Sequence, residues 1–187
     1  MSGNTSAAAR RSGVNWRILG WGTAVLLLLL PLAAMQFTDE VHWTAGDFVF
    51  AAVLFGSVGL IFELTVRNSP NWSYRGGVAA ALAATFLLVW ANGAVGLIGT
   101  EDNPYNLLFL LVPIAALAGS VVARFRSAAM ARAMLVAAAM QAFLGPLVLA
   151  LTWSSRSPIW PKELLFSSAI FAGIWLTSAW LFGRAAR

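Results

Sequence analysis

Apolar residues along this chain are gathered into six long stretches, which are separated by short polar connections. Each stretch is close to the ~20 residues that an α-helix needs to cross the hydrocarbon core of a bilayer. They predict membrane-spanning helices over residues 18–37, 47–66, 78–99, 107–123, 133–153 and 164–182. The predicted fold is an all-α, polytopic transmembrane helical bundle at residues 17–183, preceded by a disordered tail at 1–16 and followed by a short tail at 184–187.

Composition supports lipid as the solvent for these stretches. The chain has 187 residues, of which 60% are hydrophobic and 10% are charged, whereas soluble domains carry about 25% charged residues. A soluble chain of this length could not hide so much apolar surface from water. The basic residues are scattered between the apolar stretches, so the net charge of +5 does not indicate nucleic acid as a partner. The absence of cysteine excludes disulfides and thiolate chemistry.

The distribution of basic residues predicts that both termini are cytoplasmic. With six spans and the N-terminus inside, the inner segments hold ten of the twelve basic residues: Arg10, Arg11, Arg17, Arg67, Arg75, Arg124, Arg126, Arg132, Arg184 and Arg187. Only Arg156 and Lys162 fall outside. Short cytoplasmic loops are enriched in arginine and lysine, so the span count and the orientation support each other. The predicted location is the inner, cytoplasmic membrane of a cell.

The first apolar stretch has an alternative interpretation as a cleaved signal peptide, because arginines precede it. Its ~20 apolar residues exceed the 7–15 of a signal peptide's hydrophobic region, and Leu32 occupies a position where a small residue is preferred. Cleavage would leave five spans and the same orientation for the rest.

A second alternative for the fold is that of an inverted-repeat transporter. It rests on the similar segments GSVGLI at 56–61 and GAVGLI at 93–98.

Glu63 is the only ionisable residue well inside a predicted span, and intramembrane charges are candidates for function. It lies near the end of its helix, four residues before Arg67. This is the favourable order for an ion pair along a helix, so an interfacial pair and an ion-handling group both remain open. Asn92 and Gln141 are the other polar candidates within spans. Each could join two helices by a hydrogen bond or line a path for a solute.

The most distinctive polar segment lies at residues 101–106, between the third and fourth spans. Asn103 is expected to be a helix N-cap, with Pro104 at the first helical position. The alternative is a weak cation site, because carboxylate and amide oxygens are the ligands that Ca²⁺ and Mg²⁺ prefer. Its candidate ligands are Glu101, Asp102, Asn103 and Asn106. The single histidine, His42, excludes sites that need several histidines.

Four short patterns together resemble a loose set of small bacterial inner-membrane proteins of unassigned function. They are W-x3-D at Trp43–Asp47, F-E-L at Phe62–Leu64, W-x-N at Trp90–Asn92 and G-x-E-D-N-P at Gly99–Pro104. The resemblance covers Trp43–Leu151. It implies a bacterial cytoplasmic-membrane setting and no activity, cofactor or catalytic residue. Tryptophan-rich sensory proteins differ in having five spans, and rhomboid proteases in having a Gly-x-Ser nucleophile and an intramembrane histidine.

Three classes of function are consistent with the sequence. The first is a non-catalytic accessory or assembly component of a membrane complex, which packs against other membrane proteins or copies of itself. The second is a small-solute or ion transporter or channel, in which Glu63, Asn92 and Gln141 form the polar lining. The third is a membrane enzyme, for which no acid–base or nucleophile pair is visible at membrane depth. We expect the first class, with no catalytic residue, no bound metal and no cofactor.

Overall fold

The computed structural model describes residues 16–67, 69, 71–94, 96–98, 103–152 and 161–187. This part of the chain is helical and contains no strand, which confirms the predicted all-α class. Its helices are α1 (Trp16–Ala34), α2 (Ala45–Val66), α3 (Trp72–Ala94), α4 (Asn106–Phe109), α5 (Leu111–Val122), α6 (Ser127–Thr152) and α7 (Pro161–Ala185). Five of these, α1, α2, α3, α6 and α7, are long and apolar enough to cross a membrane. The fourth predicted span corresponds to α4 and α5, which together form a shorter apolar segment.

The chain forms two units, and the boundary between Gly59 and Leu60 falls within α2. In the first unit, a Cβ added at Gly59 would lie 3.1 Å from Cη2 of Trp21, so the glycine accommodates the indole of α1. The start of α2 is closed by a reciprocal cap. Oδ2 of Asp47 accepts hydrogen bonds from the backbone N–H of Thr44 (2.7 Å) and from its hydroxyl (2.8 Å), and the backbone N–H of Asp47 donates to Oγ1 of Thr44 (3.3 Å).

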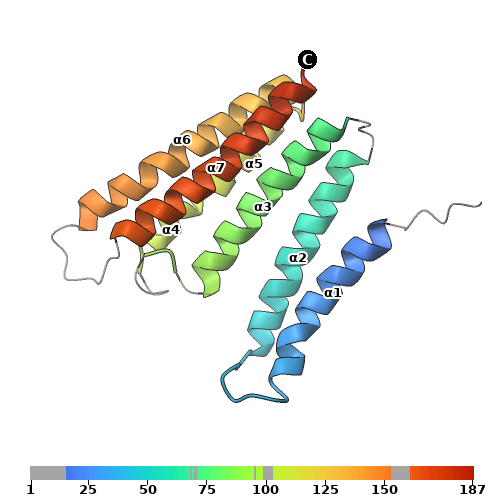
Figure 1. Ribbon diagram of the computed structural model, residues 1–187, viewed down its shortest axis with the longest axis vertical. Helices are drawn as coiled ribbons and strands as arrows, with labels where there is room; N and C mark the ends of the chain where they lie inside the picture. The colour runs from blue at the N-terminus through green and yellow to red at the C-terminus, as the bar shows by residue number, and fades with distance from the viewer. Residues whose placement is uncertain (1–15, 68, 70, 95, 99–102, 153–160) are drawn as a thin grey trace, which may run out of the picture. The chain divides into compact units, whose positions relative to one another are not determined.

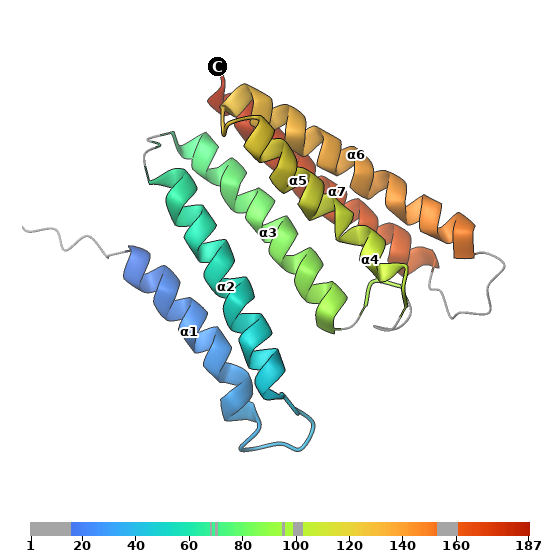
Figure 2. The same cartoon turned by 180° about the vertical axis from the view of Figure 1, so that it is seen from behind.

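In the second unit, α7 packs against both α3 and α6, and α5 packs against α6 (Figures 1 and 2). Glycines allow close approach at each of these interfaces. A Cβ added at Gly77 of α3 would lie 3.0 Å from the ring of Phe182, and one added at Gly119 of α5 would lie 2.9 Å from Cβ of Ala133. The hydroxyl of Ser178 also donates a hydrogen bond to the carbonyl oxygen of Gly77 (2.8 Å). Small residues and interhelical hydrogen bonds are characteristic of packing between membrane helices.

Capping places α3 earlier along the chain than the apolar pattern predicts. The helix begins at Trp72, six residues before the predicted start at residue 78, because Oδ1 of Asn71 accepts hydrogen bonds from the backbone N–H groups of Ser73 (2.9 Å) and Tyr74 (3.2 Å). It ends at Ala94 rather than at residue 99. Gly96 follows with a φ of 71°, a conformation that glycine adopts without the Cβ clash of other residues.

The last two long helices also extend beyond their apolar stretches. Helix α6 begins at Ser127 rather than at residue 133, because its first turns are rich in alanine, the best helix former. Helix α7 runs from Pro161 to Ala185, beyond the predicted 164–182. Proline is favoured at the first position of a helix. Glu163 in the first turn and Arg184 in the last turn complement the helix dipole.

The segment Asn106–Val122 is interrupted at Leu110, which separates α4 from α5. Pro113 explains the interruption, because proline has no N–H to donate to the carbonyl four residues earlier and its ring clashes with that carbonyl. At the other end of α5, Arg124 and Phe125 have φ values of 49° and 57°. Two consecutive non-glycine residues in the left-handed region are uncommon, and they form a tight turn into α6.

Candidate functional site

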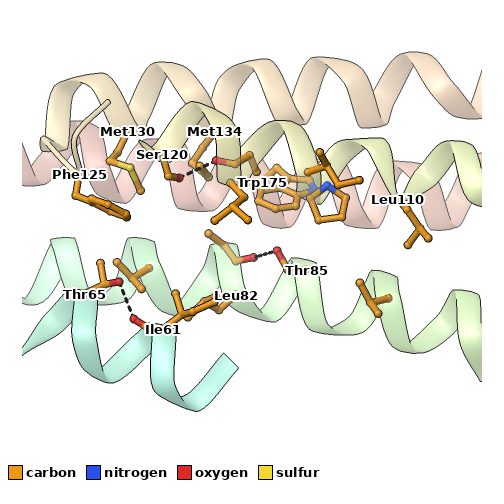
Figure 3. A pocket seen from close by; sticks show the side chains of 17 residues that line it. Ile61, Thr65, Leu82, Thr85, Leu110, Ser120, Phe125, Met130, Met134 and Trp175 are labelled. Atoms are coloured by element: carbon orange, nitrogen blue, oxygen red, sulfur yellow. Dashed lines mark hydrogen bonds between the residues drawn. The ribbon is translucent and has the colours of Figure 1, made fainter. Parts of the chain in front are cut away.

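A groove of about 350 Å³ lies between α3 and α5 in the second unit (Figure 3). One wall is α3, from Val78 to Val89, and the other is α5. The remaining lining comes from Trp175 of α7, two methionines of α6, Phe125 and the last turns of α2. The complete lining is Ile61, Thr65, Val78, Ala81, Leu82, Thr85, Val89, Leu110, Pro113, Ile114, Ala116, Leu117, Ser120, Phe125, Met130, Met134 and Trp175.

The groove has an apolar surface, and none of the described residues that line it is ionisable. Its three hydroxyl groups are each bonded to a carbonyl oxygen of their own helix, four residues earlier. Thr65 donates to Ile61 (2.6 Å), Thr85 to Ala81 (3.0 Å) and Ser120 to Ala116 (2.7 Å), as the dashed lines in Figure 3 show. These hydroxyl protons are therefore already committed to the backbone. The groove offers an occupant dispersion contacts and hydrocarbon burial rather than polar recognition.

The lining includes both exposed apolar side chains and one buried hydrogen-bond donor. Ile114 and Leu117 of α5 are exposed large apolar residues, so this wall continues onto the outer surface of the helix. Trp175 is fully buried, and its indole N–H has no hydrogen-bond partner among the described residues. A buried tryptophan N–H ordinarily finds an acceptor. The groove is therefore an apolar site that is open at its rim. One of its lining residues, Trp175, carries the unsatisfied N–H donor.

The three polar candidates within spans lie on three different helices. Glu63 is half-buried near the end of α2, Asn92 lies on α3, and Gln141 lies on α6. None of them lines the groove. Helix α7 packs against both α3 and α6 (Figure 1). A shared polar lining formed by these three residues therefore stays a prediction, and the groove is a different site.

Asn92 and Gln141 differ in how far their hydrogen-bonding capacity is met. Nδ2 of Asn92 donates to the carbonyl oxygen of Leu88 (2.9 Å), while its Oδ1 is buried without a partner. Gln141 is 0% exposed, and neither its Nε2 nor its Oε1 has a partner among the described residues. An unsatisfied buried amide is costly, so Gln141 reduces the stability of the α6 interface.

Replacing Gln141 by methionine is expected to raise the free energy of unfolding by about 1–2 kcal/mol, because the variant keeps the side-chain length and removes the cost of a buried, unpaired amide. Unfolding by dodecyl sulfate titration in detergent measures the change. The exposed Gln36 provides the matched control, and Gln36→Met is expected to leave stability unchanged. A loss of stability in Gln141→Met would mean that the amide has a partner in the folded protein.

The loop before α4 uses its amides for structure. Oδ1 of Asn106 accepts hydrogen bonds from the backbone N–H groups of Leu97 (2.9 Å) and Ile98 (2.8 Å), and Asn106 is buried. Oδ1 of Asn103 accepts from the backbone N–H of Tyr105 (3.1 Å). The predicted N-cap at Asn103 is wrong, because the N-cap of α4 is Tyr105. Asn103 forms a turn with Tyr105 instead.

The cation-site hypothesis is therefore weakened at Asn103 and Asn106, whose amide oxygens already accept backbone hydrogen bonds. Its other two candidates, Glu101 and Asp102, lie outside the described residues, as does the N-terminal tail at 1–15. Among the described residues, no group of three histidine, aspartate or glutamate side chains could hold a metal ion. His42 is exposed in the connection between α1 and α2.

Comparison of the chain with protein-family models, with curated proteins and with solved structures finds no match. The groove is therefore the candidate site, and no pattern in the sequence predicted it. Its apolar residues are of the same kind as those that face lipid or pack between helices, so composition does not distinguish them. The sequence feature nearest to the groove is Pro113, a proline within the fourth predicted span that lines one wall.

Proposed function

We propose that the protein is a non-catalytic membrane component that binds a hydrocarbon chain in the groove between α3 and α5. The observation that carries this proposal is the lining itself, which is apolar, without ionisable side chains, and has its hydroxyls bonded to their own helices. The volume of about 350 Å³ is within the ~300–1,000 Å³ of ligand sites. Such a surface favours a hydrocarbon chain over a polar solute.

The dimensions of the groove suit an extended, flexible chain. The wall of α3 extends over eleven residue steps from Val78 to Val89, which is ~16 Å at 1.5 Å per residue. A thread-like occupant of that length can lie along this wall and contact both α3 and α5.

The setting we propose is a bilayer crossed six times, with both termini on the cytoplasmic side. Five long apolar helices and the shorter segment Asn106–Val122 support the count. The arginines flanking these helices support the orientation. The resemblance to small bacterial inner-membrane proteins favours the cytoplasmic membrane of a bacterium. As an accessory or assembly component, the protein would act through its helix surfaces and the hydrocarbon it holds.

Filling the groove tests the proposal. Ala81 of α3 lines the groove and is half-buried, so Ala81→Phe places a ring where the hydrocarbon would lie. The expected result is that native mass spectrometry of the protein, released from mild detergent, shows a retained lipid-like molecule on the wild type and at least a tenfold lower occupancy on Ala81→Phe. That fold-change corresponds to about 1.4 kcal/mol, less than the ~1.5–3 kcal/mol of one buried apolar side chain.

Ala79→Phe is the matched control. Ala79 is exposed on the same helix and does not line the groove, so this variant adds the same ring to the outer surface. It is expected to retain the bound molecule as the wild type does. Equal retention by wild type, Ala81→Phe and Ala79→Phe would show that the hydrocarbon binds elsewhere and would remove the proposal.

One observation favours the second candidate, a small-solute or ion transporter. Gln141 keeps a buried amide that has no partner in the part of the chain that the structure describes, and polar groups retained at a cost to stability are often functional. The two functions separate in proteoliposomes. Under our proposal Gln141→Met changes stability alone, whereas loss of solute or ion flux in a folded Gln141→Met variant would favour the transporter.

A further inference from the structure

Arginines lie close in sequence to two residues that line one end of the groove, Phe125 and Thr65 (Figure 3). Phe125 lines that end and is flanked in the chain by Arg124 and Arg126, both of which are exposed. Thr65 lines the same groove from α2, and the exposed Arg67 follows it two residues later. Glu63 is the acidic residue nearest to this end in sequence and offsets one of these charges. The end of the groove at the α5–α6 turn is therefore positively charged, while its length is apolar.

The backbone of the turn that carries Arg124 and Arg126 is fixed at the end of the groove. Arg124 and Phe125 have φ values of 49° and 57°, and the backbone N–H of Phe125 donates to the carbonyl oxygen of Ser120 (3.2 Å). The hydroxyl of Tyr74, at the start of α3, donates to the carbonyl oxygen of Phe125 (3.1 Å). This bond joins the first turn of α3 to the end of α5, so the two walls of the groove meet at the basic turn.

The length of the groove matches one leaflet of a bilayer. Its α3 wall is ~16 Å long, and half of a hydrocarbon core of ~30 Å is ~15 Å. The rim residues Ile114 and Leu117 are exposed on the outer surface of α5, which gives a lipid chain a sideways entry under the proposed membrane setting. Guanidinium groups bind phosphate through charge-assisted hydrogen bonds, and basic pockets between membrane helices bind anionic headgroups.

We propose that the groove holds an acyl chain of an anionic phospholipid, whose phosphate is bound by Arg124 and Arg126. This inference rests on the proposed function and adds the class of lipid to it. The lipid belongs to the leaflet that meets the α5–α6 turn. The apolar groove provides the affinity for the chain, and the arginines provide the selection for a negatively charged headgroup over a zwitterionic one.

Competition between two lipids with identical acyl chains tests the inference. The full-length protein is reconstituted with an equal mixture of phosphatidylglycerol and phosphatidylcholine, and native mass spectrometry counts the lipid that remains bound. The wild type is expected to retain phosphatidylglycerol in preference. The double variant Arg124→Gln, Arg126→Gln is expected to lose roughly thirtyfold in this preference, from about fivefold for each basic residue near an anionic surface, while total lipid retention persists.

Three further measurements assign the binding. Arg124→Lys with Arg126→Lys keeps the charge and is expected to keep most of the preference, and Lys162→Gln, at the start of α7, is expected to leave it unchanged. Excess inorganic phosphate is expected not to displace the lipid, because the chain holds it. Phosphatidylglycerol with a photoreactive acyl chain is expected to label the wild-type protein at the peptide that contains Met130 and Met134, both of which line the groove.

The outcomes separate the two proposals. Equal retention of both lipids by the wild type overturns the anionic-lipid inference and leaves hydrocarbon binding intact. Loss of the preference in phosphate, or labelling confined to peptides outside the groove, overturns it as well. Unchanged retention in Ala81→Phe removes the proposed function itself. The wild-type measurements decide the inference even where the glutamine variant does not fold.

Discussion

Replacing Asn106 by leucine is expected to lower the free energy of unfolding by about 3 kcal/mol, because two backbone N–H groups would lose their acceptor. Oδ1 of Asn106 accepts from Leu97 (2.9 Å) and Ile98 (2.8 Å). Asn106 and Ile98 are both buried, so water cannot readily replace the lost bonds. Leucine has a similar size to asparagine and tests the acceptor rather than the volume. Unfolding by dodecyl sulfate titration, monitored by circular dichroism, measures the change in the free energy of unfolding.

Asn103→Leu is the control for that prediction within the same loop. Oδ1 of Asn103 accepts one bond, from the backbone N–H of Tyr105 (3.1 Å), and the residue is only half-buried. Its loss is expected to cost about 1 kcal/mol or less. Equal effects of the two variants would contradict the central role of Asn106. If Ca²⁺ raised the melting temperature of the wild type but not of Asn106→Leu, the cation site in this loop would regain support.

Gly145→Ala is expected to destabilise the packing of α6 against α7 by about 2 kcal/mol, a value typical of overpacking in a core. A Cβ added at Gly145 would lie 2.5 Å from Oγ of Ser168 and 2.8 Å from its Cβ. Oγ can rotate away, but Cβ is attached directly to the backbone of α7, so the helices must separate. Interfaces between membrane helices use small residues for this reason. The melting temperature in detergent is the measurement.

Gly173→Ala provides the matched control for Gly145→Ala. Gly173 lies on α7, is exposed, and has no atom within 4 Å of an added Cβ. Both variants gain the ~1 kcal/mol by which alanine is a better helix former than glycine. Gly173→Ala is therefore expected to be neutral or stabilising, and the difference between the two variants isolates the clash. A Gly145→Ala protein as stable as Gly173→Ala would show that α6 and α7 are not packed as described.

The sequence predicts the helical class and the approximate place of every long helix, because lipid and helix geometry leave few alternatives. It misplaces helix ends where polar residues decide them. Asn71 caps α3 six residues before the apolar stretch begins, and an alanine-rich start extends α6 to Ser127. Hydropathy does not register either effect, since both depend on backbone hydrogen bonds and helix propensity rather than on transfer to lipid.

The roles of single polar residues were harder to predict than the helices. Asn103 and Asn106 have the same side chain in one short loop, yet the buried Asn106 accepts two backbone hydrogen bonds and the half-buried Asn103 accepts one within a turn. The different roles of the two asparagines depend on where the segment after α3 places the backbone N–H groups of Leu97 and Ile98. The groove depends in the same way on how α3, α5 and α7 pack, which no local pattern in the sequence records.

Under the six-span topology that we propose, the short segment Asn106–Val122 has a consequence for the lipid around it. Its seventeen residues span only ~25 Å at 1.5 Å per residue, whereas a typical hydrocarbon core is ~30 Å thick. A bilayer responds to such hydrophobic mismatch by thinning locally, at a cost of fractions of a kcal/mol per ångström. Bilayers with shorter tails would accommodate this helix with less deformation, so membrane thickness would influence where in a cell the protein accumulates.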